Sequence, residues 1–279
     1  MKRRRFLQIT AAALVARPAM SAEWRGTALG ADARIIVTGP EADAALRDVS
    51  ALLDRIEATF SLYRDSELVR LNASGAAAPS DLMIRALALC DRLHRATGGV
   101  FDPTVQPLWR ALAEGQDPTA AQAAVGWHRV MLGEKVQLAP GQALTLNGMA
   151  QGLGADLVRD WLAARGFGQA LVNLGEYAAL GGPFRIGLAD GGDTTLRGAA
   201  LAVSEPGALR LAGHSHILHP AGAAPLWSLV AVEADSATLA DGLSTALVFT
   251  TANEARAIRA DLGGIHRIWL GDANGLVQV

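Results

Sequence analysis

The stretch "TLADGLSTALVF", from Thr238 to Phe249, places the strongest constraint on how this chain can fold. Its residues are almost all apolar or small, which predicts a helix that is packed away from water over most of its surface. Asp241 and Thr245 interrupt this pattern four residues apart, and such residues share one face of a helix. A buried carboxylate needs a hydrogen-bonded partner or a metal ion. The rest of the chain must therefore supply both a layer that covers this helix and a partner for Asp241.

The composition is that of a globular protein and excludes several functional classes. The chain has 279 residues, of which 51% are hydrophobic and 19% charged, so it can bury a large core in one or two domains. Its net charge of -2 gives no electrostatic footprint for nucleic acid, and we expect no nucleic-acid partner. The single cysteine, Cys90, excludes an internal disulfide framework and is expected to be a small core residue on an amphipathic helix.

The N-terminal segment 1–22 is predicted to be an export signal and not part of the fold. The sequence "MKRRRFLQITAAALVARPAMSA" has a basic start and an apolar run too short to span a bilayer, followed by small residues. The stretch from Arg3 to Gln8 resembles the twin-arginine export pattern, and an ordinary Sec signal with extra arginines is the alternative. We therefore expect cleavage near Ala22 and a soluble periplasmic domain over 23–279, with no transmembrane segment in the mature chain.

The order of the expected elements predicts an α+β or a mixed α/β fold, and we adopt the α+β class, in which mixed sheets and flanking helices form one compact globule. Ser80 and Thr238 are expected N-caps, and Gly98-Gly99 is expected to end a helix. We expect strands at 33–39, 169–182, 183–190, 199–205, 214–220, 227–234 and 266–279, helices at 41–61, 80–99, 152–168, 238–249 and 253–263, and short strands and turns over 124–148. No phosphate-binding glycine motif or nucleophile elbow is present in the sequence.

Several polar clusters lie at the ends of these expected elements, where functional sites usually form. They are "FSLYRDSELVRLN" (60–72), "GGVFDPTVQPLW" (98–109), "TLNGMAQGLGAD" (145–156), "VNLGEY" (172–177) and "HSHILHP" (214–220). Each cluster is weakly informative alone. The three histidines of the last cluster could ligate a metal, but His216 and His219 would point to opposite faces of a strand, which disfavours zinc.

Taken together and in this order, the clusters resemble the ApbE family of FAD:protein FMN transferases. The family patterns "fSxYxxxSExxrLN", "tGGxFDpTvxPLw" and "vNlGG" correspond to "FSLYRDSELVRLN", "TGGVFDPTVQPLW" and "VNLGE". The glycine-rich start of a helix corresponds to "GMAQGLGAD", "HIxDPxxG" to "HILHPAGA", and "xADxxsTA" to "LADGLSTA". The resemblance extends from about Gly26 to Val279, and six ordered motifs are far more specific than any one of them.

This resemblance implies an explanation for the polar pair in the apolar helix. In the family, the aspartate and threonine of "ADxxsT" ligate a magnesium ion that clamps the pyrophosphate of FAD. The implied metal-binding residues here are Asp241 and Thr245, with main-chain carbonyls near Gly148 and Ser244. One carboxylate, one hydroxyl and carbonyls are the hard oxygen ligands that Mg²⁺ prefers when substrate phosphates complete its shell. The alternative is that Asp241 caps a helix and Thr245 is only a packed helical residue.

The resemblance also implies the reaction and the residues that contact FAD. A threonine hydroxyl of an acceptor protein would attack the FMN-side phosphorus of FAD, and AMP would leave. Asp241 and His216 are the implied catalytic residues, with His216 moving a proton or orienting phosphate. The implied cofactor-binding residues are Leu29, Tyr63, Val100, Phe101, Asp102, Thr145, Gln151 and Ala221. The implied partner is an acceptor flavoprotein of a membrane electron-transfer complex.

Four departures from the family pattern put the substrate preference in doubt more than the fold. Gln151 and Thr145 replace a common lysine and aspartate, His219 replaces the aspartate of "DP", and Gly175-Glu176 replaces a pair of glycines. The twin-arginine start and the "NGMAQG" segment resemble the NosX-like subgroup of nitrous-oxide respiration. Two other functions stay open: a hydrolase that cleaves FAD to FMN and AMP, and a flavin-binding accessory protein without transferase activity.

Overall fold

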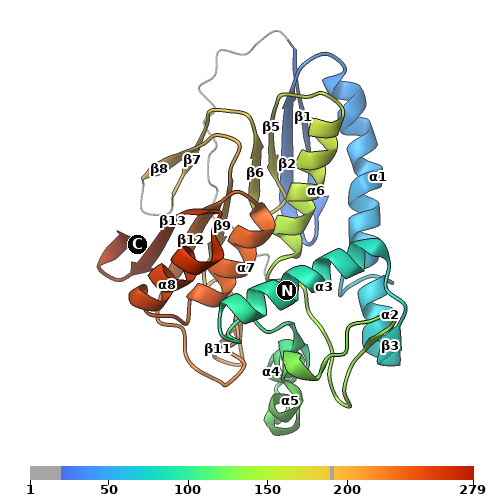
Figure 1. The fold of residues 1–279 in the computed structure, drawn as a ribbon, viewed down its shortest axis with the longest axis vertical. Coiled ribbons are helices and arrows are strands. Elements are labelled where there is room, and N and C mark those ends of the chain that lie inside the picture. The colour runs from blue at the N-terminus through green and yellow to red at the C-terminus, as the bar shows by residue number, and fades with distance from the viewer. Residues whose placement is uncertain (1–19, 189–191) are drawn as a thin grey trace.

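Strands from both halves of the chain form one antiparallel sheet of eight strands in the order β1-β2-β5-β6-β9-β12-β13-β14 (Figure 1). This computed structural model describes residues 20–188 and 192–279. The strands of the large sheet are β1 (Ser21–Ala28), β2 (Ala31–Thr38), β5 (Gln169–Asn173), β6 (Tyr177–Leu180), β9 (Ala200–Ser204), β12 (Leu229–Ala234), β13 (Ile265–Asp272) and β14 (Gly275–Gln278).

Eight α-helices and three small strand pairs complete the described part of the chain. The helices are α1 (Ala42–Phe60), α2 (Glu67–Ser74), α3 (Asp81–Ala96), α4 (Gln106–Glu114), α5 (Thr119–Ala124), α6 (Ala150–Ala164), α7 (Ala237–Leu247) and α8 (Ala252–Leu262). The small pairs are β3 (Ala76–Ala77) with β4 (Val136–Gln137), β7 (Phe184–Gly187) with β8 (Asp193–Leu196), and β10 (Arg210–Leu211) with β11 (His214–Ser215). Single 3-10 turns lie at Pro103–Val105 and Trp127–Arg129.

Both faces of the large sheet are covered, which explains why its central strands are mostly apolar. Helices α1, α6 and α7 pack on one face, in the layer that faces the viewer in Figure 1. In β12, Val230 and Val232 belong to the core under these helices, whereas Ala231 belongs to a second core on the opposite face. Phe184 and Ile186 of β7 contribute to that second core. The β7–β8 hairpin therefore shields the outer face of the sheet.

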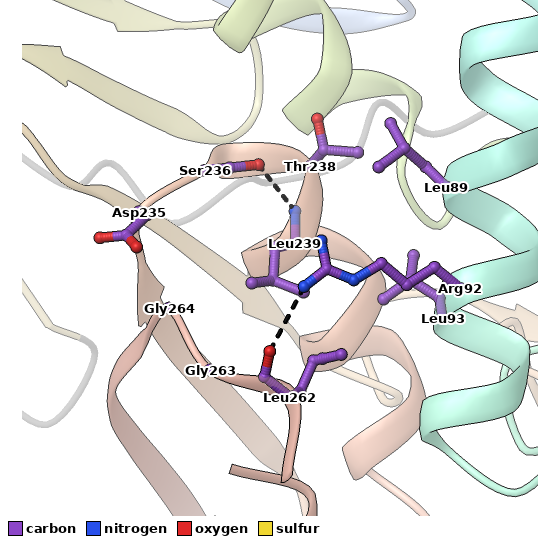
Figure 2. A pocket seen from close by; sticks show the side chains of 10 residues that line it. All are labelled: Leu89, Arg92, Leu93, Asp235, Ser236, Thr238, Leu239, Leu262, Gly263 and Gly264. Atoms are coloured by element: carbon purple, nitrogen blue, oxygen red, sulfur yellow. Dashed lines mark hydrogen bonds between the residues drawn. The ribbon is translucent and has the colours of Figure 1, made fainter. Parts of the chain in front are cut away.

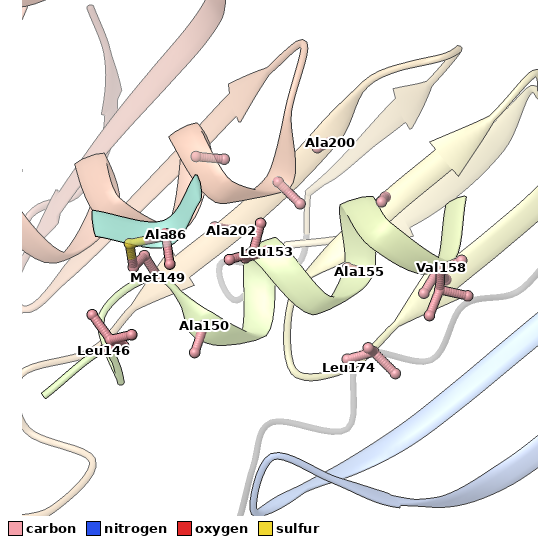
Figure 3. Close-up of a cluster of buried hydrophobic side chains, with 14 of the residues drawn as sticks. Ala86, Leu146, Met149, Ala150, Leu153, Ala155, Val158, Leu174, Ala200 and Ala202 are labelled. Carbon is pink, nitrogen blue, oxygen red and sulfur yellow. The ribbon is translucent and has the colours of Figure 1, made fainter. Parts of the chain in front are cut away.

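The helix α6 is the centre of the main core. Leu153 and Val158 point from α6 toward buried residues of neighbouring elements, and Ala200 and Ala202 of β9 lie behind it (Figure 3). Met149, just before α6, is fully buried, and its sulfur lies 3.2 Å from that of Cys90 in α3. The expectation that Cys90 is a small core residue is confirmed, since its side chain is completely buried.

The close approach of α6 to α7 depends on a glycine in the first turn of α6. A β-carbon built on Gly152 would overlap the carbonyl oxygen of Ala237 and would lie 2.5 Å from its carbonyl carbon. The same β-carbon would lie 2.8 Å from the β-carbon of Asp241. Only a residue without a side chain fits between the two helices here, because neither neighbour is the end of a flexible side chain.

We expect Gly152→Ala to lower the free energy of unfolding by about 3 kcal/mol, at the upper end of the usual cost of overpacking. The reason is that α7 must shift away from α6 to admit the methyl group. Chemical denaturation of the two proteins measures the difference. Gly168→Ala is the matched control, because a β-carbon at Gly168 meets nothing within 4 Å. Equal stability of Gly152→Ala and Gly168→Ala would contradict this description of the helix junction.

The α+β prediction and most of its elements are confirmed. The expected helices correspond to α1, α3, α6, α7 and α8, and Ser80 caps α3 by accepting a hydrogen bond from Met83 N. The expected strand at 214–220 is wrong beyond His214–Ser215, because the chain bends at His216 and Ile217. The strand β1 and the helices α2, α4 and α5 were not predicted. Among the described residues, none of the helices is both long and apolar enough to cross a membrane.

The predicted export signal lies almost entirely outside the described residues. Arg3 and the rest of the twin-arginine pattern fall within residues 1–19. The strand β1 begins at Ser21 and pairs with β2, with Ala22 opposite Val37. The expected cleavage position near Ala22 is therefore at the start of this strand.

Candidate active site

The helix α7, on which the site depends, is held at its N-terminus by a carboxylate from α6. Asp156 accepts hydrogen bonds from Ala237 N at 2.9 Å and from Thr238 N at 2.8 Å. Its carboxylate also accepts from the hydroxyls of Ser236 and Thr238, at 2.8 and 2.7 Å. This arrangement satisfies main-chain donors that a helix leaves unpaired at its first turn, and it complements the helix dipole.

One expectation about this end of the helix is wrong, and one residue was missed. Ser236, not Thr238, is the N-cap of α7, because its side chain accepts from Leu239 N at 3.2 Å. The hydroxyl of Thr238 is bonded to Asp156 instead. Asp156 belongs to a quoted motif, but it was not singled out as a functional residue. Its signal in the sequence is a carboxylate on the apolar face of a helix, the same signal that identified Asp241.

Asp241 is buried, and its direct partner is the main chain of α6. Its Oδ2 accepts a hydrogen bond from Gly152 N at 2.9 Å, and the residue is only 4% exposed. Burial raises the pKa of Asp241 to about 7; the bond from Gly152 lowers this pKa, and the charge of Asp156 raises it. No ion pair within the described residues neutralises Asp241. The carboxylate is thus suited to bind a cation from outside the protein.

Of the other three predicted metal-binding residues, Thr245 lies one turn after Asp241 in α7, Ser244 contacts Asp241, and Gly148 contacts Thr245. The hydroxyl of Thr245 is 3.4 Å from the carbonyl oxygen of Gly148, just before α6. Ser244 is fully buried, and its hydroxyl donates to the main-chain oxygen of Asp241 at 3.0 Å. A β-carbon at Gly148 would lie 3.1 Å from Thr245 Cγ2 and 3.4 Å from the Phe101 ring. The structure therefore brings the carbonyl of Gly148 and the hydroxyl of Thr245 together beside Phe101.

Glu176 adds a second buried carboxylate that was noticed only as a departure from the family pattern. Its Oε2 accepts a hydrogen bond from Val203 N at 3.0 Å, and the residue is 8% exposed. Burial raises the pKa of Glu176 well above its ordinary value, and the charge of Asp241 raises this pKa further. The two acids therefore disfavour each other's ionisation, which an external cation would relieve.

We expect Glu176→Gln to stabilise the metal-free protein, and the gain to grow between pH 5 and pH 8. An acid whose pKa is raised by folding costs stability as the pH rises from its unfolded pKa toward its folded pKa. Glutamine avoids this cost and still accepts from Val203 N, so the advantage at pH 8 should be on the order of 1 kcal/mol or more. Thermal unfolding in a chelator at both pH values measures it. A variant less stable than the parent at pH 8 would refute the argument.

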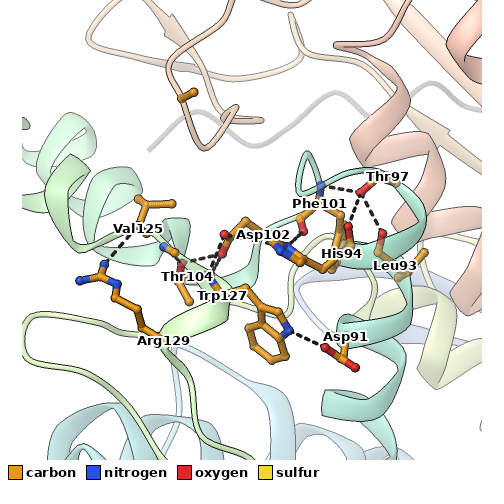
Figure 4. Close-up of polar contacts among 12 residues, drawn as sticks. Asp91, Leu93, His94, Thr97, Phe101, Asp102, Thr104, Val125, Trp127 and Arg129 are labelled. Atoms are coloured by element: carbon orange, nitrogen blue, oxygen red, sulfur yellow. Dashed lines mark hydrogen bonds and ion pairs between the residues drawn. The ribbon is translucent and has the colours of Figure 1, made fainter.

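Hydrogen bonds hold Phe101 and Asp102 (Figure 4), two residues of the predicted nucleotide-contacting turn that begins at Val100. Phe101 N donates to Thr97 Oγ1 at 2.9 Å. The carboxylate of Asp102 accepts from Thr104 N at 2.8 Å and from Trp127 N at 3.0 Å. Its oxygens are thus used to shape the turn, and any contact of Asp102 with a nucleotide would come in addition to these bonds.

Thr145 belongs to the same region of the site as this turn. Its main-chain nitrogen donates to Pro103 O at 2.8 Å, and its hydroxyl accepts from Asn147 N at 3.2 Å. Thr145 thereby connects the turn to the segment that leads into Gly148. Thr145 and the turn at Val100, Phe101 and Asp102 are therefore neighbouring parts of the candidate site.

Leu29, Gln151 and Tyr63 are connected to one another through Glu57 and the start of α6. Gln151 Nε2 donates to Leu29 O at 3.4 Å, and Leu29 N donates to Glu57 Oε1 at 3.1 Å. Glu57 also pairs with Arg64, the neighbour of Tyr63. Tyr63 is 77% exposed, so its ring is available for contact with a planar ligand. Gln151 precedes Gly152 in the first turn of α6, and Gly152 N donates to Asp241. This group of residues is therefore connected to Asp241 through the first turn of α6.

The loop that carries His216 and Ala221 packs at the C-terminal end of α7. The ring of His219 meets the ring of Phe249 edge to face, with 5.1 Å between centroids. Ala221 N donates to His219 Nδ1 at 3.0 Å, and burial lowers the pKa of His219. His216 Nδ1 lies 3.2 Å from Leu209 O. In the described parts of the chain, no three histidine, cysteine or acidic side chains are grouped so that they could hold a metal ion. This includes the three histidines of the 214–220 segment.

A cavity of about 380 Å³ lies between α3 and the first turn of α7 (Figure 2). Its walls are Leu89, Arg92, Leu93, Asp235, Ser236, Thr238, Leu239, Leu262, Gly263 and Gly264. Arg92 reaches across it to the carbonyl oxygen of Leu262 at 3.3 Å. The cavity therefore adjoins the start of α7, whereas Thr245 lies in the last turn of that helix.

The fold matches solved structures over nearly the whole chain. The apo form of the flavinyl transferase ApbE of Pseudomonas stutzeri is 26% identical, with a TM-score of 0.80 and coverage of 93% of this chain and 94% of that one. The flavin transferase ApbE of Vibrio cholerae is 25% identical, with a TM-score of 0.78 and coverage of 94% and 97%. The ApbE protein of Thermotoga maritima, at 23% identity, a TM-score of 0.80 and coverage of 93% and 96%, supports the fold alone.

Sequence comparisons agree with this structural match. An FAD:protein FMN transferase of Vibrio cholerae is 27% identical over 241 residues, which cover 72% of this chain and 72% of that protein. The model of the ApbE family matches residues 26–269, which include all six motifs and every predicted site residue. The resemblance seen in the sequence is confirmed, and the chain belongs to the ApbE family.

Proposed function

We propose that this chain is an Mg²⁺-dependent flavin transferase that moves FMN from FAD to a threonine of an acceptor flavoprotein. The observation that carries the proposal is that Asp241 and Thr245, one turn apart on α7, contact Gly152 N and Gly148 O at the start of α6. A carboxylate, a hydroxyl and a carbonyl form a partial shell of hard ligands, which suits Mg²⁺ completed by substrate phosphates. Burial raises the pKa of Asp241 to about 7, and a cation bound there would stabilise the charged carboxylate, which supports the same assignment.

When bound, Mg²⁺ would neutralise charge on the pyrophosphate of FAD. Asp241, Thr245 and the carbonyls of Gly148 and Ser244 would hold it. The acceptor's threonine oxygen forms a bond to the FMN-side phosphorus, the bond from that phosphorus to the bridging oxygen breaks, and AMP leaves. His216 is the candidate to take the hydroxyl proton or to orient the phosphate. Little covalent chemistry is required of the protein, since positioning and charge neutralisation supply most of the catalysis.

The remaining predicted residues would bind the two ends of FAD. Tyr63 would lie against the flavin, as its exposed ring permits. Val100, Phe101 and Asp102 would contact the nucleotide from their turn, together with Thr145, Ala221 and Leu29. Gln151 can donate a hydrogen bond to FAD, but it carries no charge to offset phosphate. The affinity for FAD therefore depends more strongly on the cation here than in a relative with lysine at this position.

Incubation of the protein with FAD, Mg²⁺ and candidate acceptor proteins, followed by intact mass measurement, tests the proposal. Transfer adds the mass of FMN to a threonine of the acceptor and releases AMP. Release of free FMN and AMP with an unmodified acceptor would identify the FAD hydrolase instead. Binding of FAD without any product would identify the accessory protein, which Gln151 and Thr145 favour. Omission of Mg²⁺ is the control and should stop the reaction.

The proposed acceptor is a flavoprotein of a membrane electron-transfer complex, and the proposed location is the periplasm. Arg3 and Arg4 of the predicted twin-arginine signal carry the proposal on location. We expect replacement of both by lysine to leave the precursor in the cytoplasm, because that pathway requires the arginine pair. Fractionation of cells expressing each form measures this. Mature variant in the periplasm at the normal level would indicate Sec export instead. The assignment to the NosX-like subgroup stays a prediction.

A further inference from the structure

Ser204, the last residue of β9, joins the hydroxyl groups of α7 into a buried network that no motif identified. Its Oγ lies 2.8 Å from Ser244 Oγ and 3.5 Å from Thr245 Oγ1. Ser204 is 7% exposed and Ser244 is fully buried, so solvent has little access to these groups. The neighbouring Val203 N is fixed by its bond to Glu176, which holds the end of β9 in place beside α7.

The directions of these hydrogen bonds follow from counting protons. A hydroxyl has one proton to donate and two lone pairs that accept. Ser244 uses its proton on the main-chain oxygen of Asp241, at 3.0 Å. With the proton of Ser244 given to Asp241 O, Ser204 is the donor in its 2.8 Å bond with Ser244. The lone pairs of Ser204 are then directed to accept, and the Thr245 hydroxyl is within reach.

When a cation is bound, it matters which atom accepts the hydroxyl proton of Thr245. A hydroxyl that ligates a cation presents a lone pair to it, so its proton must point away from the cation. Thr245 has two acceptors nearby, Gly148 O at 3.4 Å and Ser204 Oγ at 3.5 Å. The carbonyl of Gly148 is itself a proposed ligand, and a proton directed toward it would approach the cation. Ser204 is the acceptor that keeps the proton on the far side.

We propose that Ser204 is a positioning residue for the metal site: it accepts the proton of Thr245 and so turns the lone pair of that hydroxyl toward the cation. This inference rests on the proposed function, because it assumes that Asp241 and Thr245 bind the cation. Hydrogen-bond partners of metal ligands commonly change metal affinity by about 10- to 100-fold when they are removed. The expected effect is therefore on the affinity for the cation and not on the fold.

Mn²⁺ binding, followed by the electron paramagnetic resonance of the free ion in the presence of FAD, tests the inference. We expect Ser204→Ala to weaken Mn²⁺ binding by about 10- to 100-fold. Ser204→Thr and Ser204→Val form a second pair, since they have the same shape and differ only in the hydroxyl. Ser204→Thr should bind Mn²⁺ at least about tenfold more tightly than Ser204→Val. This pair keeps the test valid if Ser204→Ala fails to fold.

A serine outside the site provides the matched control. Ser228 donates to Gly271 O at 3.0 Å, and Ser228→Ala should bind Mn²⁺ as the parent does. In the transfer assay, Ser204→Ala should need more Mg²⁺ for half-maximal rate and recover most of its rate at saturating Mg²⁺. A merely structural loss would lower the rate at every concentration.

The outcomes separate this inference from the proposed function. Parent-like Mn²⁺ affinity in both Ser204→Ala and Ser204→Val, with an active parent protein, would overturn the role of Ser204 alone. A parent protein that neither binds Mn²⁺ nor transfers FMN would overturn the proposed metal site and this inference together.

Discussion

Asp241→Asn is expected to lower the rate of FMN transfer at ordinary Mg²⁺ by about 10³-fold or more. A metal ion contributes several kcal/mol of charge stabilisation, and each loss of about 1.4 kcal/mol slows a reaction tenfold. Asparagine keeps an oxygen that can accept from Gly152 N, so the helix junction should survive. The metal-free variant should be at least as stable as the parent, because a buried charge without an ion-pair partner is removed. Transfer rates against Mg²⁺ concentration, with thermal unfolding of both proteins, measure the two effects.

Asp235→Asn is the control for this change. Asp235 lies six residues earlier, just before α7, but its carboxylate is exposed and pairs with His266 at 2.7 Å. Removal of that charge should leave the rate within about twofold, because a surface pair contributes little. If Asp241→Asn retained full activity at ordinary Mg²⁺, the proposed cation site would have to be abandoned.

Asp156→Ala should give the largest loss of stability among these variants, about 3–5 kcal/mol, the usual cost of breaking a buried charged pair. The change removes the acceptor for Ala237 N, Thr238 N and two hydroxyls at the start of α7. It also leaves Arg159, paired with Asp156 at 2.9 Å, without that partner. Urea denaturation measures the loss. Because α7 carries the proposed metal-binding residues Asp241 and Thr245, Mn²⁺ binding should weaken in the same variant.

Asp160→Ala is matched to this change, since Asp160 lies one turn further along α6 and also pairs with Arg159, at 2.8 Å. Its side chain is half exposed, so the loss should stay below about 1 kcal/mol. Similar losses for the two alanine variants would mean that Asp156 does not act as the anchor of α7.

The sequence predicted the elements that contain a long and regular repeat of apolar residues. The prediction failed where such a repeat is short. The helices α1 and α3 have clear amphipathic repeats and visible ends, so their bounds were found to within a few residues. The expected strand at 214–220 failed because "HSHILHP" alternates like a strand, but it bends after Ser215, and His219 packs against Phe249, just after α7. Such packing is set by residues distant in the sequence, which a local pattern does not contain.

The candidate site was predicted unevenly for a related reason. Asp241 was found from its own segment, because a carboxylate in an apolar helix is unusual. The contacts of Glu176 and Ser204 depend on which strands lie beside α7, and this order is fixed only by the complete sheet. The need for Gly152 was hidden as well, because it arises from the distance between two helices and not from a turn.

The contacts that build the site join residues far apart in the sequence, and this affects when the site can exist during synthesis of the chain. Gly152 and Asp241 are 89 residues apart, and Gly148 and Thr245 are 97 apart. A nascent chain that ends before α7 has the glycine-rich turn but not the carboxylate or the hydroxyl. At about 5–20 residues per second, the ribosome needs several seconds to add the missing segment. Cation binding is therefore possible only near the end of translation, when α7 is available to pack on α6.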